Sequence, residues 1–285
     1  MEARLGEGAI WNHETQELFW VDIVGKRLHI LEPATREHRS LPTPSMISTV
    51  VPVTDSLCIV ALQDGAYFMD TNNGDLTHYV SLDTANTETR LNDGKCDPAG
   101  RFWVGSMHMP GKKADGKLYM IEEDGKVAVQ MDSVTISNGI VWTKDQKTMY
   151  YIDTPTGEIS AFDFDRRTGD IGNRRTAVNI PDTLGFPDGM AIDEEDKLWV
   201  GLWNGNAVAR FDPENGSLMQ KIKVPAHNVT ACAFGGENLD SLFITSARIG
   251  MTPEELEKYP DAGSIFVAVP GVKGVKSDFF RLEGH

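Results

Sequence analysis

The amino-acid sequence predicts an all-β fold, a six-bladed β-propeller whose blades are four-stranded antiparallel sheets. Two observations lead to this prediction: a strand-like segment recurs at a nearly constant period, and long amphipathic helix patterns are almost absent. The recurring segments are centred on six apolar anchors, which are Trp20, Ile59, Trp103, Tyr150, Trp199 and Phe243. Successive anchors are 39, 44, 47, 49 and 44 residues apart, a period typical of one propeller blade.

Hairpin signals beside the anchors account for the other strands of each blade. Gly116–Ile121, for example, is an apolar run that precedes the pair Asp124-Gly125. Asp-Gly tolerates the positive φ of a tight turn, so apolar runs on both sides of it indicate two antiparallel strands. We also expect an innermost strand upstream of each anchor, as at residues 140–142 and 190–192.

The last blade carries two special features in this prediction. Residues 252–258 form one short helix, with Thr252 as its cap and Pro253 at its first position, inserted at the surface. The chain begins inside a blade at residues 6–8 and ends in a lone strand at residues 277–282. We therefore expect the N- and C-terminal strands to complete one blade together, so that residues 1–285 form a single closed domain.

Composition limits the classes of partner and the cellular location that we expect for this protein. Asp and Glu outnumber Lys and Arg by 42 to 27, which gives a formal net charge of −15. This charge argues against nucleic acid and anionic membranes as partners, although an ordinary acidic surface also explains it. Cys58, Cys96 and Cys232 lie in or beside strand patterns and are expected as buried free thiols. Since no signal-peptide or membrane-span pattern is found, we expect a cytoplasmic protein, with its oligomeric state left open.

Polar side chains recur at one place upstream of four anchors. Asn92, Asn138 and Asp188 precede their anchors by 11, 12 and 11 residues, and Glu7 precedes its anchor by 13. Taken singly, the Asn-Asp-Gly, Asn-Gly and Asp-Gly sequences at three of these places are ordinary turn signals. Innermost strands of a propeller line its central channel, so residues that begin them face one another across one mouth. The shared spacing therefore favours a common site.

The residue types in this position indicate a hard cation. Glu7, Asn138 and Asp188 offer two carboxylates and an amide oxygen, with no His or Cys among them. Oxygen ligands select Ca²⁺ first, with Mg²⁺ or Mn²⁺ as alternatives, whereas Zn²⁺ is accepted less readily because it usually takes nitrogen or sulfur. Three protein ligands leave coordination positions for water and a substrate carbonyl. Arg90 and Asn92 add donors for a polyhydroxy substrate, although a surface ion pair is the simpler interpretation of Arg90.

These motifs together resemble the senescence marker protein/gluconolactonase family, also called regucalcin-like, which includes luciferin-regenerating enzymes. The matching stretches are residues 5–8, 90–95, 97–101, 137–139, 187–190, 198–200 and 245–248. The resemblance implies a six-bladed propeller with a divalent ion in its channel and a small-molecule substrate, the lactone of a sugar acid. It implies Glu7, Asn138 and Asp188 as metal ligands and Asp188 also as the general base. Arg90 and Asn92 correspond to the substrate-binding pair.

One segment departs from the pattern of the animal members. Residues 107–116, the lid segment, are shorter and more basic than the acidic lid of those members. His108 could contact the substrate from this segment, and an exposed loop histidine is the alternative interpretation.

Metal-assisted lactone hydrolysis is the mechanism expected from these residues, with Asp188 as the base and Asp93 as the next candidate. No Gly-x-Ser-x-Gly elbow or Walker-type phosphate loop is found. A calcium-binding regulatory protein without turnover, a promiscuous aryl-ester or organophosphate hydrolase, and a protein-interaction platform remain as alternatives.

Overall fold

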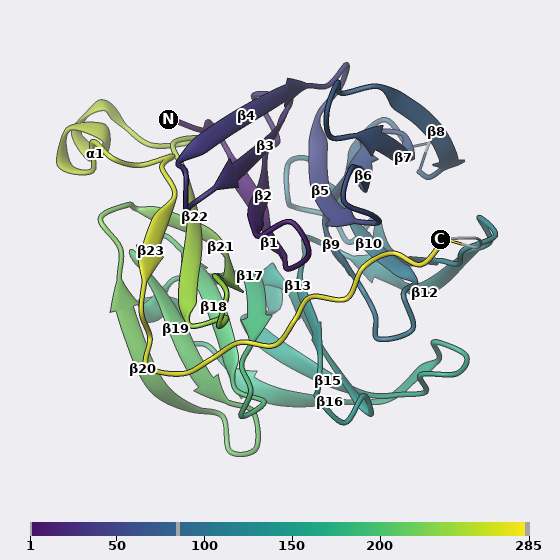
Figure 1. Ribbon diagram of the computed structural model, residues 1–285. Helices are drawn as coiled ribbons and strands as arrows, with labels where there is room; N and C mark the ends of the chain where they lie inside the picture. The colour runs from purple at the N-terminus through teal and green to yellow at the C-terminus, as the bar shows by residue number, and fades with distance from the viewer. Residues whose placement is uncertain (1, 84–85, 283–285) are drawn as a thin grey trace.

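The computed structural model describes residues 2–83 and 86–282, which form six antiparallel sheets around a central channel (Figure 1). Five sheets have four strands each, and the sixth has three among the described residues. In every sheet the strands follow their order in the chain, so each blade is a simple meander. The predicted six-bladed β-propeller is therefore confirmed.

The blades are numbered here in chain order, each from its innermost strand outward. Blade one comprises β1 Gly6–Asn12, β2 Glu17–Asp22, β3 Arg27–Glu32 and β4 Glu37–Pro42. Blade two comprises β5 Ile47–Pro52, β6 Leu57–Leu62, β7 Gly65–Asp70 and β8 Leu76–Ser81. Blade three comprises β9 Thr89–Cys96, β10 Phe102–His108, β11 Gly116–Ile121 and β12 Val127–Val134. Blade four comprises β13 Ser137–Trp142, β14 Thr148–Asp153, β15 Glu158–Phe164 and β16 Ile171–Asn179. Blade five comprises β17 Phe186–Ile192, β18 Leu198–Trp203, β19 Ala207–Asp212 and β20 Ser217–Lys223. Blade six comprises β21 Asn228–Gly235, β22 Ser241–Ala247 and β23 Phe266–Ala268. The connections contain the 3₁₀ turns η1 Thr154–Thr156 and η2 Asp182–Leu184 and the helix α1 Pro253–Lys258.

Packing between neighbouring innermost strands closes the ring. The strands β1, β5, β9, β13, β17 and β21 contact one another in that order, and β21 contacts β1. Burial decreases outward: every residue of β1 is buried, whereas none of β4 is. The anchors lie in the second strand of each blade, and Trp20, Trp103 and Trp199 are almost fully buried between blades. The hydrophobic core is therefore a ring of blade-to-blade contacts around the channel.

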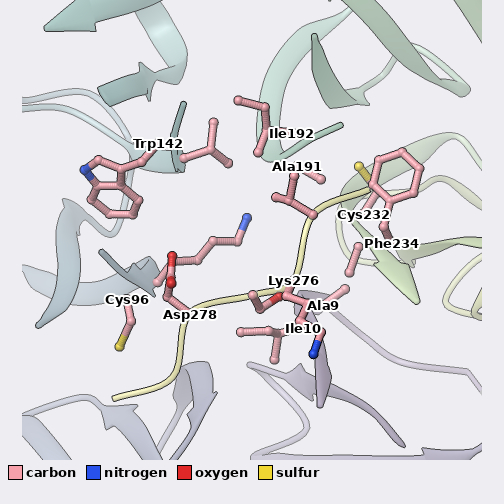
Figure 2. Close-up of a pocket in the computed structure, with 15 residues that line it drawn as sticks. Ala9, Ile10, Cys96, Trp142, Ala191, Ile192, Cys232, Phe234, Lys276 and Asp278 are labelled. Atoms are coloured by element: carbon pink, nitrogen blue, oxygen red, sulfur yellow. The ribbon is translucent and has the colours of Figure 1, made fainter. Parts of the chain in front are cut away.

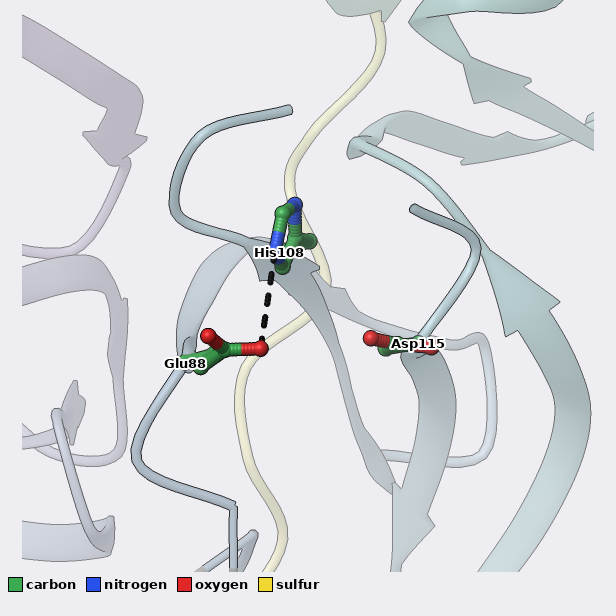
Figure 3. A group of neighbouring side chains, drawn as sticks. All are labelled: Glu88, His108 and Asp115. Carbon is green, nitrogen blue, oxygen red and sulfur yellow. Dashed lines mark ion pairs between the residues drawn. The ribbon is translucent and has the colours of Figure 1, made fainter. Parts of the chain in front are cut away.

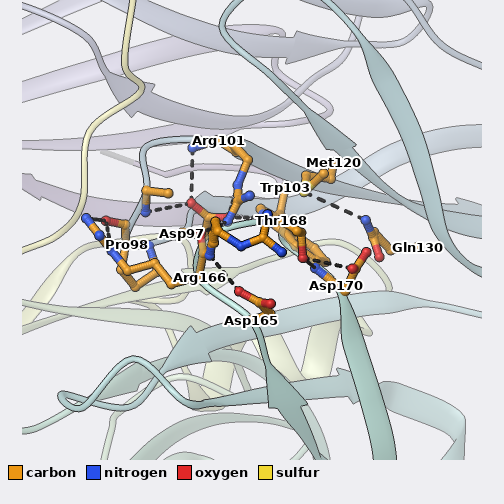
Figure 4. Close-up of polar contacts among 12 residues, drawn as sticks. Asp97, Pro98, Arg101, Trp103, Met120, Gln130, Asp165, Arg166, Thr168 and Asp170 are labelled. Carbon is orange, nitrogen blue, oxygen red and sulfur yellow. Dashed lines mark hydrogen bonds and ion pairs between the residues drawn. The ribbon is translucent and has the colours of Figure 1, made fainter.

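Two of the anchors are held by the same polar contact. The indole nitrogen of Trp103 donates to the Asp97 Oδ2 at 2.9 Å, and Arg101 donates to the same oxygen at 2.7 Å (Figure 4). Trp199 donates to the Asp193 Oδ2 at 2.9 Å in the equivalent position. A buried indole N–H needs an acceptor, so each aspartate satisfies its tryptophan and fixes the turn before it.

The prediction that the two chain ends complete one blade is wrong. The strand β1 belongs to a full four-stranded blade, and residues 277–282 form no strand. The C-terminal segment instead crosses one face of the ring toward blades two and three (Figure 1). Phe280 is buried there and packs beside the rings of Phe68 and Tyr79. The apolar pattern that suggested a strand is therefore explained by docking of a side chain between blades.

Ring closure between the last and first blades uses short backbone contacts. Leu5 forms an isolated antiparallel bridge with Ala247, and the amide groups of Arg248 and Ile249 donate to the carbonyl of Arg4 at 3.1 and 2.9 Å. The innermost strands β1 and β21 pack against each other beside this bridge.

The remaining expectations from the sequence concern the helix and the cysteines. Helix α1 has the predicted cap, since the Thr252 hydroxyl accepts from the Glu255 amide and Glu255 accepts in return from the Thr252 amide. It lies between β22 and β23, as an insertion in the last blade. Cys58, Cys96 and Cys232 are buried free thiols, as predicted. No helix among the described residues is long and apolar enough to cross a membrane.

Candidate functional site

The polar residues with a shared spacing lie at or beside β-bulges, where the pairing of an innermost strand with its neighbour shifts. The shift occurs after Glu7 in β1, after Leu91 in β9, after Ser137 in β13 and after Pro187 in β17. A bulge leaves an extra residue unpaired and re-aims its side chain. The interpretation of Asn92, Asn138 and Asp188 as turn residues is therefore wrong, because all lie within strands.

The glycines that follow two of these residues serve close packing of the innermost strands. A Cβ atom on Gly139 would lie 2.5 Å from the Met190 Cβ, and one on Gly189 would lie 2.6 Å from the Ala231 Cβ. Neither position has room for a side chain, so glycine lets adjacent strands approach at the bulge. The Asn-Gly and Asp-Gly sequences thus mark strand contacts around the channel.

One mouth of the channel contains a cavity of about 370 Å³. Five of the six predicted site residues line it, namely Glu7, Arg90, Asn92, Asn138 and Asp188. They come from blades one, three, four and five, although the first and the last lie 181 positions apart in the chain (188 − 7). Thr154 of η1 also lines the cavity. The sequence did not predict this residue, because only its place after the anchor strand of blade four distinguishes it from other threonines.

Hydrogen bonds join the polar residues of this cavity across blades. The Asn92 side-chain amide donates to the Asn138 Oδ1 at 3.1 Å and to the Ser137 carbonyl at 2.7 Å. The Asn138 amide donates to the Thr154 hydroxyl at 2.7 Å, and that hydroxyl donates to the Pro187 carbonyl at 2.8 Å. The network therefore fixes the Asn138 side chain from both sides.

Arg90 lies at the edge of this network and is partly exposed to the cavity. Its Nη1 donates to the Asn92 Oδ1 at 2.6 Å and to the Leu91 carbonyl at 2.9 Å. Burial lowers the pKa of Arg90 to about 10, while the nearby Glu7 and Asp188 carboxylates oppose that change. Arg90 is therefore the cation that faces both predicted carboxylate ligands.

The carboxyl groups of the cavity would, when ionised, carry more negative charge than Arg90 offsets. Burial raises the pKa of Glu7 to about 8, with a further contribution from Asp93. Burial also raises the pKa of Asp188 well above its ordinary value, with Glu7 and then Asp93 adding to the effect. The Asp188 Oδ1 is buried and has no hydrogen-bond partner among the described residues. Buried like charges are costly unless a cation compensates them.

These features fit a divalent cation held by Glu7, Asn138 and Asp188. The unpartnered Asp188 Oδ1 provides one oxygen. The Asn138 Oδ1 accepts only from Asn92 among the described residues, and an amide oxygen has a second lone pair to offer. A donor set made of oxygens suits Ca²⁺, Mg²⁺ or Mn²⁺.

Asp93, the second candidate base, lies deeper in the channel. It lines a separate small cavity together with Lys95, and its Oδ1 accepts from the Gly94 amide at 2.8 Å. The Lys95 ammonium donates to the Met190 carbonyl. Asp93 therefore acts on the site by its charge and does not line the larger cavity.

His108 is not among the residues that line the larger cavity. Side chains alternate along a strand, so Met107 of β10 faces the cavity while the next residue faces away. His108 lies beside Glu88 and Asp115 instead, with ligand-type atoms of all three within 4.8 Å of one another (Figure 3). The expected contact of His108 with a substrate is thus not supported by its position.

The cluster of Glu88, His108 and Asp115 is less suited to a cation than the channel mouth. The His108 Nδ1 accepts from the backbone amides of Lys112 and Lys113 at 3.2 and 3.3 Å, which leaves the proton on Nε2 and blocks that atom as a ligand. The Lys113 ammonium already donates to Glu88 at 3.0 Å. These contacts hold the lid segment against the start of blade three.

The opposite mouth of the channel is covered by the C-terminal segment. A cavity of about 70 Å³ remains there, between the far ends of the innermost strands and residues 275–278 (Figure 2). Cys96 and Cys232 line it, and burial raises the pKa of the Cys232 thiol to about 12 and that of Cys96 well above its ordinary value. Thiols in this state are poor nucleophiles.

Comparison with known proteins finds relatives that match nearly the whole chain. A model of the SMP-30/gluconolactonase/LRE-like region matches residues 5–248. Regucalcin of Danio rerio is 39% identical over 274 residues, covering 95% of this chain and 92% of that protein. A Bacillus subtilis protein named "Putative sugar lactone lactonase" is 38% identical over 266 residues, covering 93% and 91%. The crystal structure of a calcium-binding protein, regucalcin, from Agrobacterium tumefaciens superposes with a TM-score of 0.95 at 29% identity, covering 99% and 95%.

Proposed function

We propose that this chain, which belongs to the SMP-30/gluconolactonase/LRE-like family, hydrolyses the ring ester of a sugar-acid lactone. The proposed reaction uses one bound divalent cation. The observation that carries this proposal is the pair of buried carboxyl groups, Glu7 and Asp188, that line one cavity at the channel mouth. Glu7 and Asp188 are buried beside each other's charge, and the Asp188 Oδ1 has no partner among the described residues. Such an arrangement is costly for stability and is typical of a functional site.

Glu7, Asn138 and Asp188 would hold the cation, with Ca²⁺ as the first choice. A bound divalent cation supplies Lewis-acid polarisation of the lactone carbonyl and compensates negative charge that develops on its oxygen. A bound cation would also favour the ionised form of Asp188, against the effect of burial on its pKa.

Asp188 is the proposed general base. Its carboxylate accepts a proton from a water molecule as the water oxygen attacks the carbonyl carbon. The ring C–O bond then breaks, the leaving oxygen takes a proton, and the product is an open-chain hydroxy acid. Arg90 lies at the cavity edge, where its remaining N–H groups can orient the ester. His108 has no role in this proposal.

The role proposed for Asn92 differs from direct substrate binding. Both hydrogens of its amide are used within the protein, one on Asn138 and one on Ser137. Its oxygen accepts from Arg90. Asn92 therefore positions a cation ligand and the substrate-orienting arginine, and we propose that it acts through these two neighbours.

A proton-release assay on glucono-δ-lactone tests this function. Protein stripped with a chelator should lose activity and regain it when Ca²⁺, Mn²⁺, Mg²⁺ or Zn²⁺ is added. It should remain folded throughout, because the blades are held by their own sheets and by packing between them. Full activity in protein shown to be metal-free would disprove the cation-dependent mechanism. Cation binding without hydrolysis of any lactone would instead favour a calcium-binding protein without turnover.

A further inference from the structure

The walls of the cavity are apolar, in contrast to its polar floor. Phe186 lies directly opposite Trp203 in the pairing of β17 with β18, and both line the cavity. Met107 forms a backbone bridge with Ile136, and this second apolar pair lines the side formed by blades three and four. Phe186 is 40% exposed, so its ring is accessible from the cavity.

The hydrogen-bond donors of the floor are largely used within the protein. Asn92 uses both amide hydrogens, and Asn138 and Thr154 each donate to a neighbour. A substrate hydroxyl that enters a cavity without a partner loses its hydrogen bonds to water. Ring hydroxyls of a sugar lactone are therefore left to Arg90 and to the carboxylates of Glu7 and Asp188, whereas the apolar walls offer contact to a substituent without hydroxyls.

We propose that this cavity also accepts lactones whose ring carries an alkyl or aryl substituent. The ester would lie on the polar floor beside Asp188, and the substituent would lie against Phe186 and Trp203 or against Met107 and Ile136. The volume of about 370 Å³ falls in the range of small-molecule sites. This inference rests on the proposed lactonase activity and extends it to a second class of substrate.

The reaction on this class is the same ring opening. Water adds its oxygen to the carbonyl carbon, the bond from that carbon to the ring oxygen breaks, and the ring oxygen leaves as a hydroxyl. The substituent stays on the carbon that bears this new hydroxyl. The only co-reactant is water, and no oxidation or reduction occurs.

A pair of synthetic lactones tests the inference with calcium present. δ-Valerolactone has the bare ring, and δ-nonalactone has the same ring with a butyl chain. Burying each methylene on an apolar wall contributes about fourfold to affinity, so kcat/KM for δ-nonalactone should exceed that for δ-valerolactone by about 10- to 100-fold. A ratio near one would overturn the inference.

Replacement of Phe186 tests whether this residue forms the apolar wall that contacts the butyl chain. The Phe186→Ala variant should lower the ratio of the two kcat/KM values by about fivefold or more. Leu218→Ala is the matched control, because Leu218 is also exposed, at 44%, but lies in the outermost strand β20. An unchanged ratio in Phe186→Ala and in a Met107→Ala variant would overturn the assignment of the walls.

Glucono-δ-lactone separates failure of this inference from failure of the proposed function. Hydrolysis of glucono-δ-lactone with no preference for the butyl chain overturns only the inference. No hydrolysis of any of the three lactones, with calcium bound, overturns the proposed function and the inference with it.

Discussion

The Asn92 side-chain amide donates a hydrogen bond to the Oδ1 of Asn138 at 3.1 Å, which joins blades three and four at the candidate cation site. The bond orients an oxygen that we propose as a cation ligand. Groups that orient metal ligands commonly change affinity when they are removed, even though they do not touch the ion.

Asn92→Ala should therefore weaken calcium binding by about tenfold or more. The substitution removes the bond to Asn138 and leaves the Ser137 carbonyl without this partner. Isothermal titration calorimetry gives the dissociation constant. Asn73→Ala is the control, because Asn73 lies in an exposed turn and bonds only Asp75 among the described residues. Equal calcium affinity in Asn92→Ala and the wild type would contradict the positioning role.

Asp188→Asn should separate catalysis from stability. Activity should stay depressed by about 10²-fold or more at saturating calcium, because the base is lost while Glu7 and Asn138 still bind. The metal-free variant should be more stable than the metal-free wild type at pH 8, because a buried charge beside Glu7 is removed. The measurements are kcat across a calcium titration and thermal unfolding in chelator.

The control for this substitution is Asn138→Asp, which keeps an oxygen ligand and leaves Asp188 in place. It should cost much less activity at saturating calcium. If Asp188→Asn recovers fully at high calcium, Asp188 is only a ligand and is not the base.

His29 should make stability depend on pH. Burial lowers the pKa of His29 to about 4, with His38 adding to the effect. The folded state thus favours neutral His29, so its contribution is complete above pH 6.5 and is lost as pH falls toward 4. The loss should reach about 2–3 kcal/mol of unfolding free energy between these limits.

His29→Phe keeps a ring that can stack on Trp20, whose centroid lies 5.1 Å from the imidazole. Urea unfolding at pH 7 and pH 4.5 should show a smaller difference in this variant than in the wild type. His78→Gln, at an exposed histidine, should leave the difference unchanged. The same pH dependence in all three proteins would rule out His29 as its source.

Phe280→Ala should lower the unfolding free energy by about 3 kcal/mol or more, because a buried ring beside Phe68 and Tyr79 is lost. Val269→Ala, at a residue 78% exposed, should change stability little. Lactone hydrolysis at low temperature should persist in Phe280→Ala, since the C-terminal segment covers the opposite mouth. If Phe280→Ala changes the urea midpoint no more than Val269→Ala does, docking of the C-terminal segment does not stabilise the ring.

Local sequence patterns predict much of the fold. The spacing of Trp20, Trp103 and Trp199 predicted the blades, because each blade repeats the same strands and buries the same position. The spacing of Glu7, Asn92, Asn138 and Asp188 predicted which residues share one cavity. Both predictions depend on the repeat, since equivalent positions in a closed ring face the same axis.

Only the tertiary structure decided which groups remain available at that cavity. His108 faces away because of its place in the alternation of β10, and the Asn92 amide is already bonded to residues of another blade. The C-terminal segment docks by a buried Phe280 where a strand was expected. The sequence by itself determined the repeat and the chemistry of each side chain, because both are local. Hydrogen-bond pairing, burial and cavity walls join residues far apart in the chain, so they exist only once the ring has closed.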